Sequence, residues 1–249
     1  TEDVRFAIKE VMFNEKITPV FPVRFKSGNC PDGEPMKLTI IDDYTFKLSF
    51  DEPYGSFPAG LAISGWVGYT DLIKPSHYLK KFHIKYSSLE DMKPYLEEEE
   101  LEDAWWDLFT LKDIENWDLT NKNAVGFPVL YPWKMVKSES NIFIYERNPY
   151  YFKVDSAGNQ LPYIDRITTQ VVSDFASYTM KAITGDIDYL GERASMKKLP
   201  LFLEQKEKEN FKVLIPRMHR TPYTFYLNLT YEDPDWRKVV RDVRFRKAL

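Results

Sequence analysis

The stretch from residue 142 to residue 191 constrains the fold more than any other part of this chain. In residues 142–147, Ile142, Ile144 and Glu146 alternate with Phe143, Tyr145 and Arg147. This period of two predicts a β-strand. Asn148 and Pro149 then end the strand, because proline restricts the residue before it to extended geometry and cannot donate to a strand ladder. Residues 167–172 are rich in β-branched side chains and predict a second strand.

A helix pattern follows this second strand. Ser173 or Asp174 can cap the amino terminus of the helix, and Gly185 is a typical stop signal at its end. Residues 187–190 indicate that the chain then returns to the sheet. A strand, a helix and a returning strand form a βαβ-like unit. The sequence therefore predicts an α/β fold with a mixed sheet and a ligand edge at the strand ends.

The rest of the chain shows further helix and strand patterns. Asp42 and Asp43 predict the turn of a hairpin. Pro75 and Ser88 each mark the start of a helix, and residues 53–68 fit a helix or a loop. Other helices are expected over residues 2–14 and 195–209 and from residues 233 and 242, and other strands over residues 36–41, 44–50, 130–136, 211–215 and 223–229.

The spacing of apolar residues in these elements predicts the core. A run of four glutamates at residues 97–100 is interpreted as a solvated helix face, because adjacent helix residues point in different directions. Trp105 follows this run at helical spacing and is expected to pack. The residues expected to be largely buried are Val4, Ile8, Val11, Leu38, Ile40, Phe46, Leu48, Ile142, Ile144, Ile167, Val171, Ile183, Ile187, Val213 and Leu227.

Composition narrows the classes of function. The net charge of -4 over 249 residues argues against a nucleic-acid surface, which usually carries a basic stripe. Aromatic residues make up 16% of the chain, which suits a core or a broad recognition surface. Cys30 is the single cysteine, so no internal disulfide can form. No run of 18 apolar residues occurs, and the sequence predicts no membrane span.

The search for catalytic motifs gives mostly negative results. Gly60, Gly65 and Gly68 lack the spacing and the lysine of a phosphate loop. The three histidines, His77, His83 and His219, form no metal pattern with Cys30. Asp186 and Asp188 would share one face of a strand, whereas a glycosidase places its two carboxylates on opposite sides of the substrate. The sequence therefore predicts no enzyme, no metal site and no cofactor.

Several motifs together resemble the family 5 bacterial extracellular solute-binding proteins. They are ERNPYY, GNQLPYIDRI, the helix ending in GDID, and NLTYEDPDWRKVVRDVRFRKAL, together with TEDVRF at the start and DDYTF at the hairpin. These receptors bind oligopeptides, dipeptides or nickel for bacterial ABC importers. One departure is LYPW at residues 130–133, where many members have Gly-Pro-Tyr. We interpret it as a subgroup variation that keeps the fold.

The resemblance implies a fold like that of type II periplasmic binding proteins, in which two lobes close on a ligand. Residues 1–126 would mostly form an extra N-terminal subdomain, and residues 127–228 the mixed α/β sheet of lobe I. Residues 229–249 would cross the hinge and begin lobe II. The chain opens directly on a helix start at residues 1–3, and the helix pattern begun at residues 242–249 has no stop signal, so we expect the chain to be truncated on both sides. An export signal and a membrane-anchoring lipoprotein segment would then lie upstream.

The function implied by the resemblance is capture of oligopeptides outside the cytoplasm, in the periplasm or extracellular space. The partners would be the ligand and the membrane permease subunits of an ABC importer. An oligosaccharide ligand on the same fold is one alternative, since aromatic rings can stack on sugar faces. A glycoside hydrolase-like enzyme and a structural module are alternatives of other classes.

The ligand site is expected where chain segments leave the sheet. Glu192 and Arg193, after the predicted strand at GDID, offer both charges to a zwitterionic peptide; an exposed ion pair is the simpler explanation. Tyr223 and Tyr226 could pack against a ligand. They lie three residues apart and would face opposite sides of an ideal strand, so at most one should reach the cleft. Asn228 could bond to backbone at the crossing into the second lobe.

Overall fold

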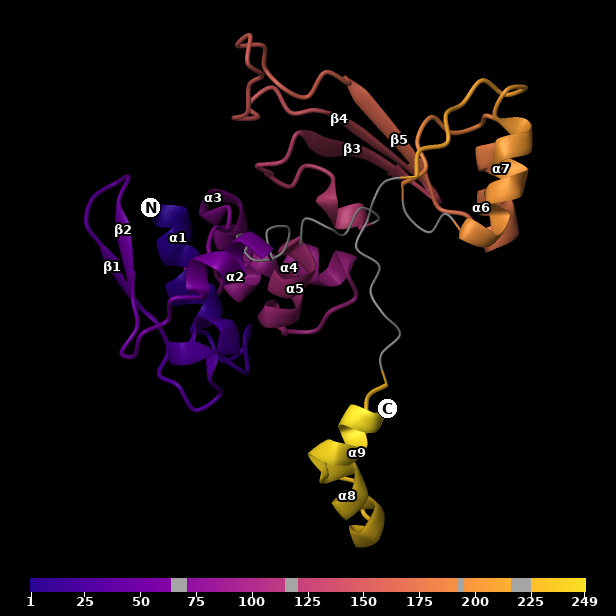
Figure 1. Ribbon diagram of the computed structural model, residues 1–249. Helices are drawn as coiled ribbons and strands as arrows, with labels where there is room; N and C mark the ends of the chain where they lie inside the picture. The colour runs from indigo at the N-terminus through magenta and orange to yellow at the C-terminus, as the bar shows by residue number, and fades with distance from the viewer. Residues whose placement is uncertain (64–70, 115–120, 192–194, 216–224) are drawn as a thin grey trace. The chain divides into compact units, whose positions relative to one another are not determined.

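The computed structural model describes residues 1–63, 71–114, 121–191, 195–215 and 225–249 (Figure 1). These residues form two compact units, Thr1–Ser173 and Asp174–Leu249. The chain contains both helices and sheets, in agreement with the predicted class, but no parallel pair of the predicted mixed sheet occurs among the described residues. The division into subdomain, lobe I and the start of lobe II, at residues 126 and 228, stays a prediction.

The first unit begins with a helix and a hairpin. Helix α1 (Glu2–Phe6) continues as a π-helical segment over Ala7–Met12, so the helix is slightly shorter than predicted. Strands β1 (Lys37–Ile40) and β2 (Phe46–Ser49) pair antiparallel. The Asp42 carboxylate accepts hydrogen bonds from the backbone N–H groups of the two residues that follow Asp43, both at 2.8 Å, and orders the predicted turn.

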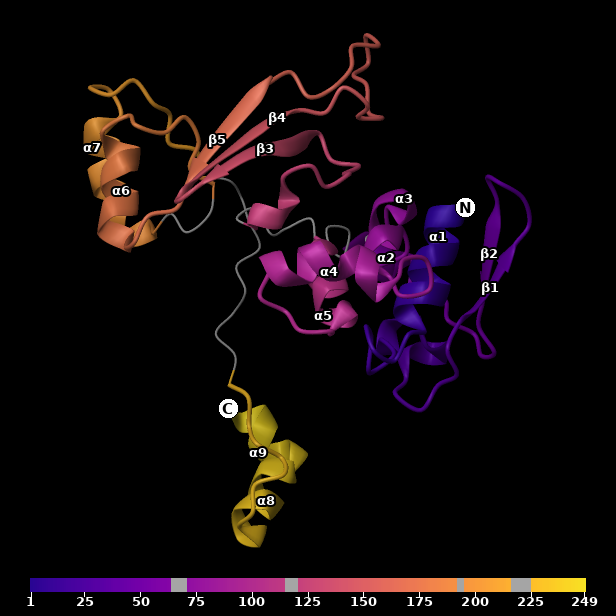
Figure 2. The same cartoon turned by 180° about the vertical axis from the view of Figure 1, so that it is seen from behind.

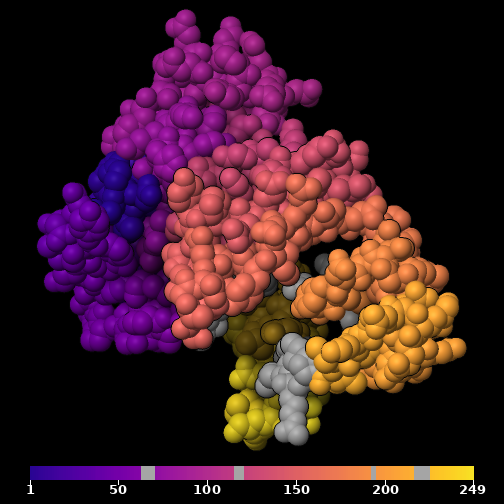
Figure 3. All heavy atoms as spheres, turned by 90° about the horizontal axis from the view of Figure 1, so that it is seen from above, coloured from indigo at the N-terminus to yellow at the C-terminus, as the bar shows by residue number. Residues whose placement is uncertain are grey.

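The amino-terminal residue lies beside this hairpin. The Thr1 hydroxyl donates to the backbone oxygen of Asp42 at 3.1 Å. The view from above shows the first residues, in indigo, among the violet atoms of the neighbouring segments (Figure 3). Contacts that join residues more than 40 positions apart thus fix the start of the chain on the first unit.

The first helix and three later helices form the largest core of the first unit. The later helices are α3 (Ser76–Leu79), α4 (Leu89–Glu98) and α5 (Trp105–Lys112). Helix α2 (Phe57–Ile63) packs Phe57 and Leu61 against a second core cluster instead. Ser88 caps α4 as predicted, and the Asp91 carboxylate completes a reciprocal capping box. Trp105 is buried, as expected. The core cluster consists of Phe6, Val11, Leu79, Phe82, Met92, Leu96, Trp105, Leu108, Phe109, Ile114 and Phe127.

The predicted solvated glutamate run is wrong at one position. Helix α4 ends at Glu98, and the next side chain, Glu99, is only 8% exposed. Its carboxylate pairs with Lys112 at 2.9 Å and with Lys122 at 3.2 Å. The hydrogen bond from Lys112, followed by that from Lys122, holds the pKa of Glu99 below its usual value. The end of the helix turns this glutamate inward, which a continuous helix pattern does not predict.

A three-stranded sheet completes the first unit. Strands β3 (Trp133–Glu139), β4 (Ile142–Arg147) and β5 (Arg166–Gln170) pair antiparallel in that order (Figure 2). The hairpin between β3 and β4 and the strand at β5 confirm the sequence predictions, although β3 begins and ends three residues later than the predicted strand 130–136. All strand pairings among the described residues are antiparallel.

The buried face of β4 is the opposite of the expected one. Phe143 and Tyr145 are buried with Met135 of β3, whereas Ile142 is 38% exposed and Ile144 is only partly buried. Both faces of this strand carry large apolar side chains. Alternation therefore predicted a strand correctly but could not decide which face packs.

Other burial expectations met mixed outcomes. In the first hairpin, Leu38 and Leu48 pack against a core cluster, while Ile40 and Phe46 are exposed because they pair at the turn end, beyond that cluster. The expected residues that are buried are Val4, Ile8, Val11 and Ile183; those partly buried are Leu38, Leu48, Ile144, Ile167, Ile187, Val213 and Leu227; those exposed are Ile40, Phe46, Ile142 and Val171.

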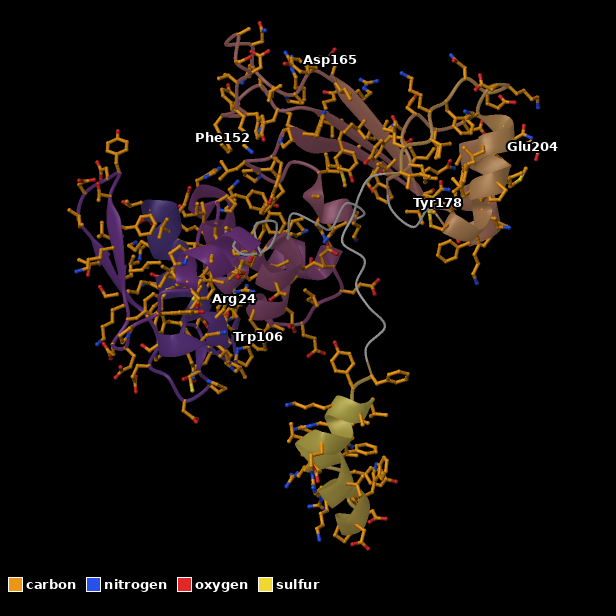
Figure 4. The ribbon with its side chains drawn as sticks, in the orientation of Figure 1. Arg24, Trp106, Phe152, Asp165, Tyr178 and Glu204 are labelled. Carbon is orange, nitrogen blue, oxygen red and sulfur yellow. The ribbon has the colours of Figure 1, made fainter. Side chains whose placement is uncertain are left out.

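The second unit contains helices in its described residues. They are α6 (Phe175–Ile183), α7 (Leu199–Gln205), α8 (Pro234–Arg241) and α9 (Val243–Ala248). The Asp174 carboxylate caps α6 through the N–H groups of Ala176 and Ser177. Gly185 follows α6 with a φ of +73°, a left-handed conformation that glycine adopts without strain. Figure 4 labels Tyr178 on α6 and Glu204 on α7.

Three predicted strands in this unit are wrong. Residues 187–190 and 211–215 form no strand, and neither do residues 225–229, the described part of the predicted strand 223–229. The βαβ-like unit therefore lacks its returning strand in this structure. A strand requires a neighbouring strand for its backbone hydrogen bonds, and no such neighbour pairs with these segments among the described residues.

Candidate functional site

The structure describes two of the five residues predicted to bind ligand. Glu192, Arg193 and Tyr223 lie outside the described residues. Tyr226 is 92% exposed, so its ring and hydroxyl are open to solvent. Because residues 225–229 form no strand, the argument that Tyr223 and Tyr226 face opposite sides of an ideal strand does not apply.

Asn228 has a local structural role. Its side-chain oxygen accepts hydrogen bonds from the backbone N–H of Thr230 at 3.0 Å and from the Thr230 hydroxyl at 2.9 Å. These two contacts order the turn that leads to the Asp233 cap of helix α8. The amide of Asn228 is thus held in one orientation, two residues after the exposed Tyr226.

A cavity lies in the first unit, away from any residue that the sequence singled out for binding. Its volume is about 480 Å³, which is within the range of small-ligand sites. Strands β3–β5 supply part of its wall, and the connection before β3 supplies another part. The lining residues are Asp3, Ile73, Lys74, Pro75, His77, Asp113, Ile114, Ala124, Phe127, Pro128, Val129, Leu130, Tyr131, Pro132, Trp133, Met135, Tyr145, Ile167 and Thr169.

Most of this wall is apolar, and an ion pair lies in it. Lys74 and Asp113 pair at 2.6 Å, with side chains 10% and 12% exposed. The second Asp113 carboxylate oxygen and the Thr169 hydroxyl are buried without a hydrogen-bond partner among the described residues. The cavity can therefore hold an apolar ligand that carries a hydrogen-bond donor. The sequence singled out LYPW at residues 130–133, which lines this cavity, but only as a departure from the family pattern. It did not indicate the cavity because the other lining residues come from distant segments.

The remaining candidates for chemistry have structural explanations. The Cys30 thiol is free and exposed. His77 is exposed, and His219 lies outside the described residues. Within the described part of the chain, no group of three or more His, Cys, Asp and Glu side chains could hold a metal ion. No helix there has both the length and the apolar character needed to cross a membrane.

Comparison with known protein families identifies the class. The model of the bacterial extracellular solute-binding proteins, family 5 Middle, matches residues 1–249. The chain therefore belongs to the family 5 bacterial extracellular solute-binding proteins, which are binding proteins with the fold of periplasmic receptors.

Individual relatives differ in what they bind. A periplasmic alpha-galactoside-binding protein of Rhizobium meliloti (strain 1021) is 27% identical over 263 residues, which cover 100% of this chain and 33% of that protein. The solved structure of the oligopeptide-binding protein OppA is 32% identical with a TM-score of 0.66, over 99% of this chain and 37% of OppA. The chain thus spans about a third of the length of these relatives.

A further solved structure supports the fold alone. The periplasmic binding protein MelB of Agrobacterium fabrum C58, in complex with stachyose, is 24% identical with a TM-score of 0.56. The match covers 82% of this chain and 26% of MelB. Receptors of one fold in this comparison therefore include an oligopeptide binder and an oligosaccharide binder.

Proposed function

We propose that this chain is part of the solute-binding component of an ABC importer and that the receptor captures oligopeptides. The observation that carries the proposal is the match to OppA, at 32% identity over 99% of this chain. The family match over residues 1–249 supports the receptor class independently of that single relative. The partners would be a peptide and the permease subunits of the importer.

The proposed ligand site comprises Glu192, Arg193, Tyr223, Tyr226 and Asn228. A peptide presents an ammonium, a carboxylate and a row of amides. The Glu192 carboxylate and the Arg193 guanidinium are the complementary charges, and Arg can bind a carboxylate through two parallel hydrogen bonds. The exposure of Tyr226 leaves its ring free to cover an apolar side chain. Closure of two lobes around the ligand would then desolvate these contacts.

Three substitutions in the receptor test this site. Glu192→Ala and Arg193→Ala are each expected to weaken peptide binding about 10- to 150-fold, because hydrogen bonds to charged groups contribute about 1.5–3 kcal/mol. Tyr223→Phe should weaken it about fivefold, because a neutral hydrogen bond contributes about 1 kcal/mol. The melting temperature of the free receptor should remain nearly unchanged. Isothermal titration with a defined peptide measures the affinity.

Glu204→Ala is the matched control for these variants. Glu204 is an exposed carboxylate on helix α7, outside the proposed site. Its replacement should leave the peptide affinity unchanged. If the three site variants bind the peptide as tightly as the Glu204→Ala variant, these side chains are not part of the ligand site.

An oligosaccharide is the second candidate ligand. Tyr189, Phe225 and Tyr226 are between 84% and 92% exposed, and exposed aromatic faces suit stacking on sugar rings. The relative that binds alpha-galactosides supports the same candidate. Titration of the receptor with stachyose and with a peptide distinguishes the two. A glycoside hydrolase-like activity would appear as turnover of a chromogenic glycoside, whereas a receptor leaves its ligand unchanged.

The proposed function also implies where the receptor acts. A receptor for an importer acts in the periplasm or on the extracellular side. We propose attachment to the membrane through a segment that precedes residue 1 of this chain. The regions 1–126, 127–228 and 229–249 are proposed as the extra subdomain, lobe I, and the hinge crossing with the start of lobe II.

A further inference from the structure

His83 is a buried titratable group to which the proposed function assigns no role. His83 is only 2% exposed. Four aromatic rings surround the imidazole, with centroids 5.0–5.9 Å away. They belong to Phe6 of α1, to Tyr86, and to Trp105 and Phe109 of α5. The ring therefore joins the first helix to helix α5 inside the largest core of the first unit.

Hydrogen bonds define which nitrogen of the ring carries the proton. The backbone N–H of Lys85 lies 3.2 Å from Nδ1 and donates to it, so Nδ1 is unprotonated. Nε2 lies 3.0 Å from the backbone oxygen of Glu10, which can only accept. Nε2 therefore carries the hydrogen and donates it, and the imidazole is neutral. The Asn14 side-chain nitrogen lies 3.4 Å from the same Nε2.

The charged groups around His83 act in opposite directions: the Glu10 carboxylate raises the pKa of the ring and the Lys85 ammonium lowers it, while burial is the largest influence and keeps the pKa below its usual value. The Glu10 carboxylate already accepts hydrogen bonds from Arg5 at 2.8 Å, Lys85 at 2.7 Å and the Tyr86 hydroxyl at 3.1 Å. Burial acts to raise the pKa of Glu10, but these donors outweigh it and the pKa lies below its usual value. Lys80, whose backbone oxygen accepts from the His83 N–H, pairs its ammonium with the Glu2 carboxylate at 2.6 Å. The α5 rings against the imidazole carry no charge.

We propose that His83 is an acid-sensitive switch, in which a second proton on the ring breaks the hydrogen bond from Lys85 and loosens residues 1–14 from helix α5. A proton on Nδ1 would point at the Lys85 N–H, which is itself a donor. The ring must then turn or leave its site. Because it is packed among four aromatic side chains, either movement disturbs the core that holds the first helix.

The sign of the pH effect follows from the surroundings of the ring. Burial lowers the pKa of His83 below its usual value of 6.5. The unfolded chain therefore takes up the proton first as the pH falls. The stability that the neutral ring contributes is full above about pH 6.5 and is lost as the pH falls from there toward the native pKa. The folded-to-unfolded ratio falls by at most about tenfold for each pKa unit between the two states.

Thermal and urea unfolding of this chain from pH 8 to pH 5 test the switch. The wild type is expected to lose stability between pH 7 and pH 5, and the His83→Gln variant should lose much less over that interval. His77→Gln is the matched control, because His77 is exposed, and it should behave as the wild type. An unchanged pH dependence in His83→Gln would overturn the proposal.

A measurement on the unsubstituted chain keeps the test decisive if His83→Gln does not fold. NMR titration of the imidazole carbon-bound protons gives the native pKa of each histidine. The proposal expects His83 to titrate below pH 6.5, its usual value, and expects the amide signals of residues 1–14 to leave their native positions as the ring gains its proton. Titration of His83 at or above pH 6.5 would overturn it.

Discussion

Replacing Glu99 with alanine is expected to lower the free energy of unfolding by about 3 kcal/mol, the lower end for removing one partner of a buried ion pair. The Glu99 and Lys112 side chains are 8% and 9% exposed, so Lys112 would stay buried with its charge uncompensated. The Asn123 side-chain oxygen, 2.8 Å from the Lys112 ammonium, would remain as a neutral acceptor and limits the loss. Urea unfolding of the chain measures the change.

The neighbouring Glu98 provides the control for this substitution. It belongs to the same run of glutamates but is exposed. Glu98→Ala should therefore change the free energy of unfolding by no more than about 0.5 kcal/mol. Equal effects of the two substitutions would show that the Glu99 side chain is exposed to solvent like the rest of the run, and would contradict its burial.

Replacing Phe143 with alanine is expected to destabilise the chain by about 3 kcal/mol, near the lower end for a buried phenylalanine because its core cluster is small. Phe143 is 5% exposed and packs with Met135 and Tyr145 on one face of the sheet. The substitution removes apolar contact area and leaves a cavity in that face. The change is measured by chemical denaturation of the chain.

Ile142 tests which face of β4 packs. It is 38% exposed, so Ile142→Ala should cost no more than about 1 kcal/mol. A larger loss of stability for Ile142→Ala than for Phe143→Ala would show that the face of β4 that carries Ile142 is the buried one. The comparison is direct because the two residues are adjacent in β4 and differ in the face that they occupy.

Local signals in the sequence predicted the ends of elements well. Ser88, Asp174 and Asp233 cap helices as expected, and Gly185 adopts the left-handed conformation after α6. The physics of a cap involves a few neighbouring residues only, so it can be recognised in a short stretch of sequence. The hairpin turn at Asp42 is predictable for the same reason.

Features that depend on distant residues were predicted poorly. The strands expected at residues 187–190 and 211–215 are absent, because an alternating pattern does not supply a pairing partner. The inward orientation of Glu99 depends on Lys112 and Lys122, 13 and 23 residues further along the chain. The orientation of β4 depends on which face meets the rest of the core.

The candidate site shows the same limit. The sequence identified the family through motifs spread along the chain, and the match over residues 1–249 confirmed it. It did not indicate the cavity beside Lys74 and Asp113, whose lining residues lie far apart in the sequence. The residues proposed for ligand binding were inferred from their position after predicted strands, and they stay a prediction.

Native mass spectrometry of the receptor that contains this chain, purified without denaturation, tests the central claim most directly. We predict a receptor population whose added mass corresponds to short peptides. The ligand released from it should consist of unmodified peptides. A bound mass that corresponds to an oligosaccharide would contradict the peptide assignment and favour the second candidate. A receptor that carries no ligand, and gains none when incubated with a peptide mixture and an oligosaccharide mixture, would contradict solute capture itself.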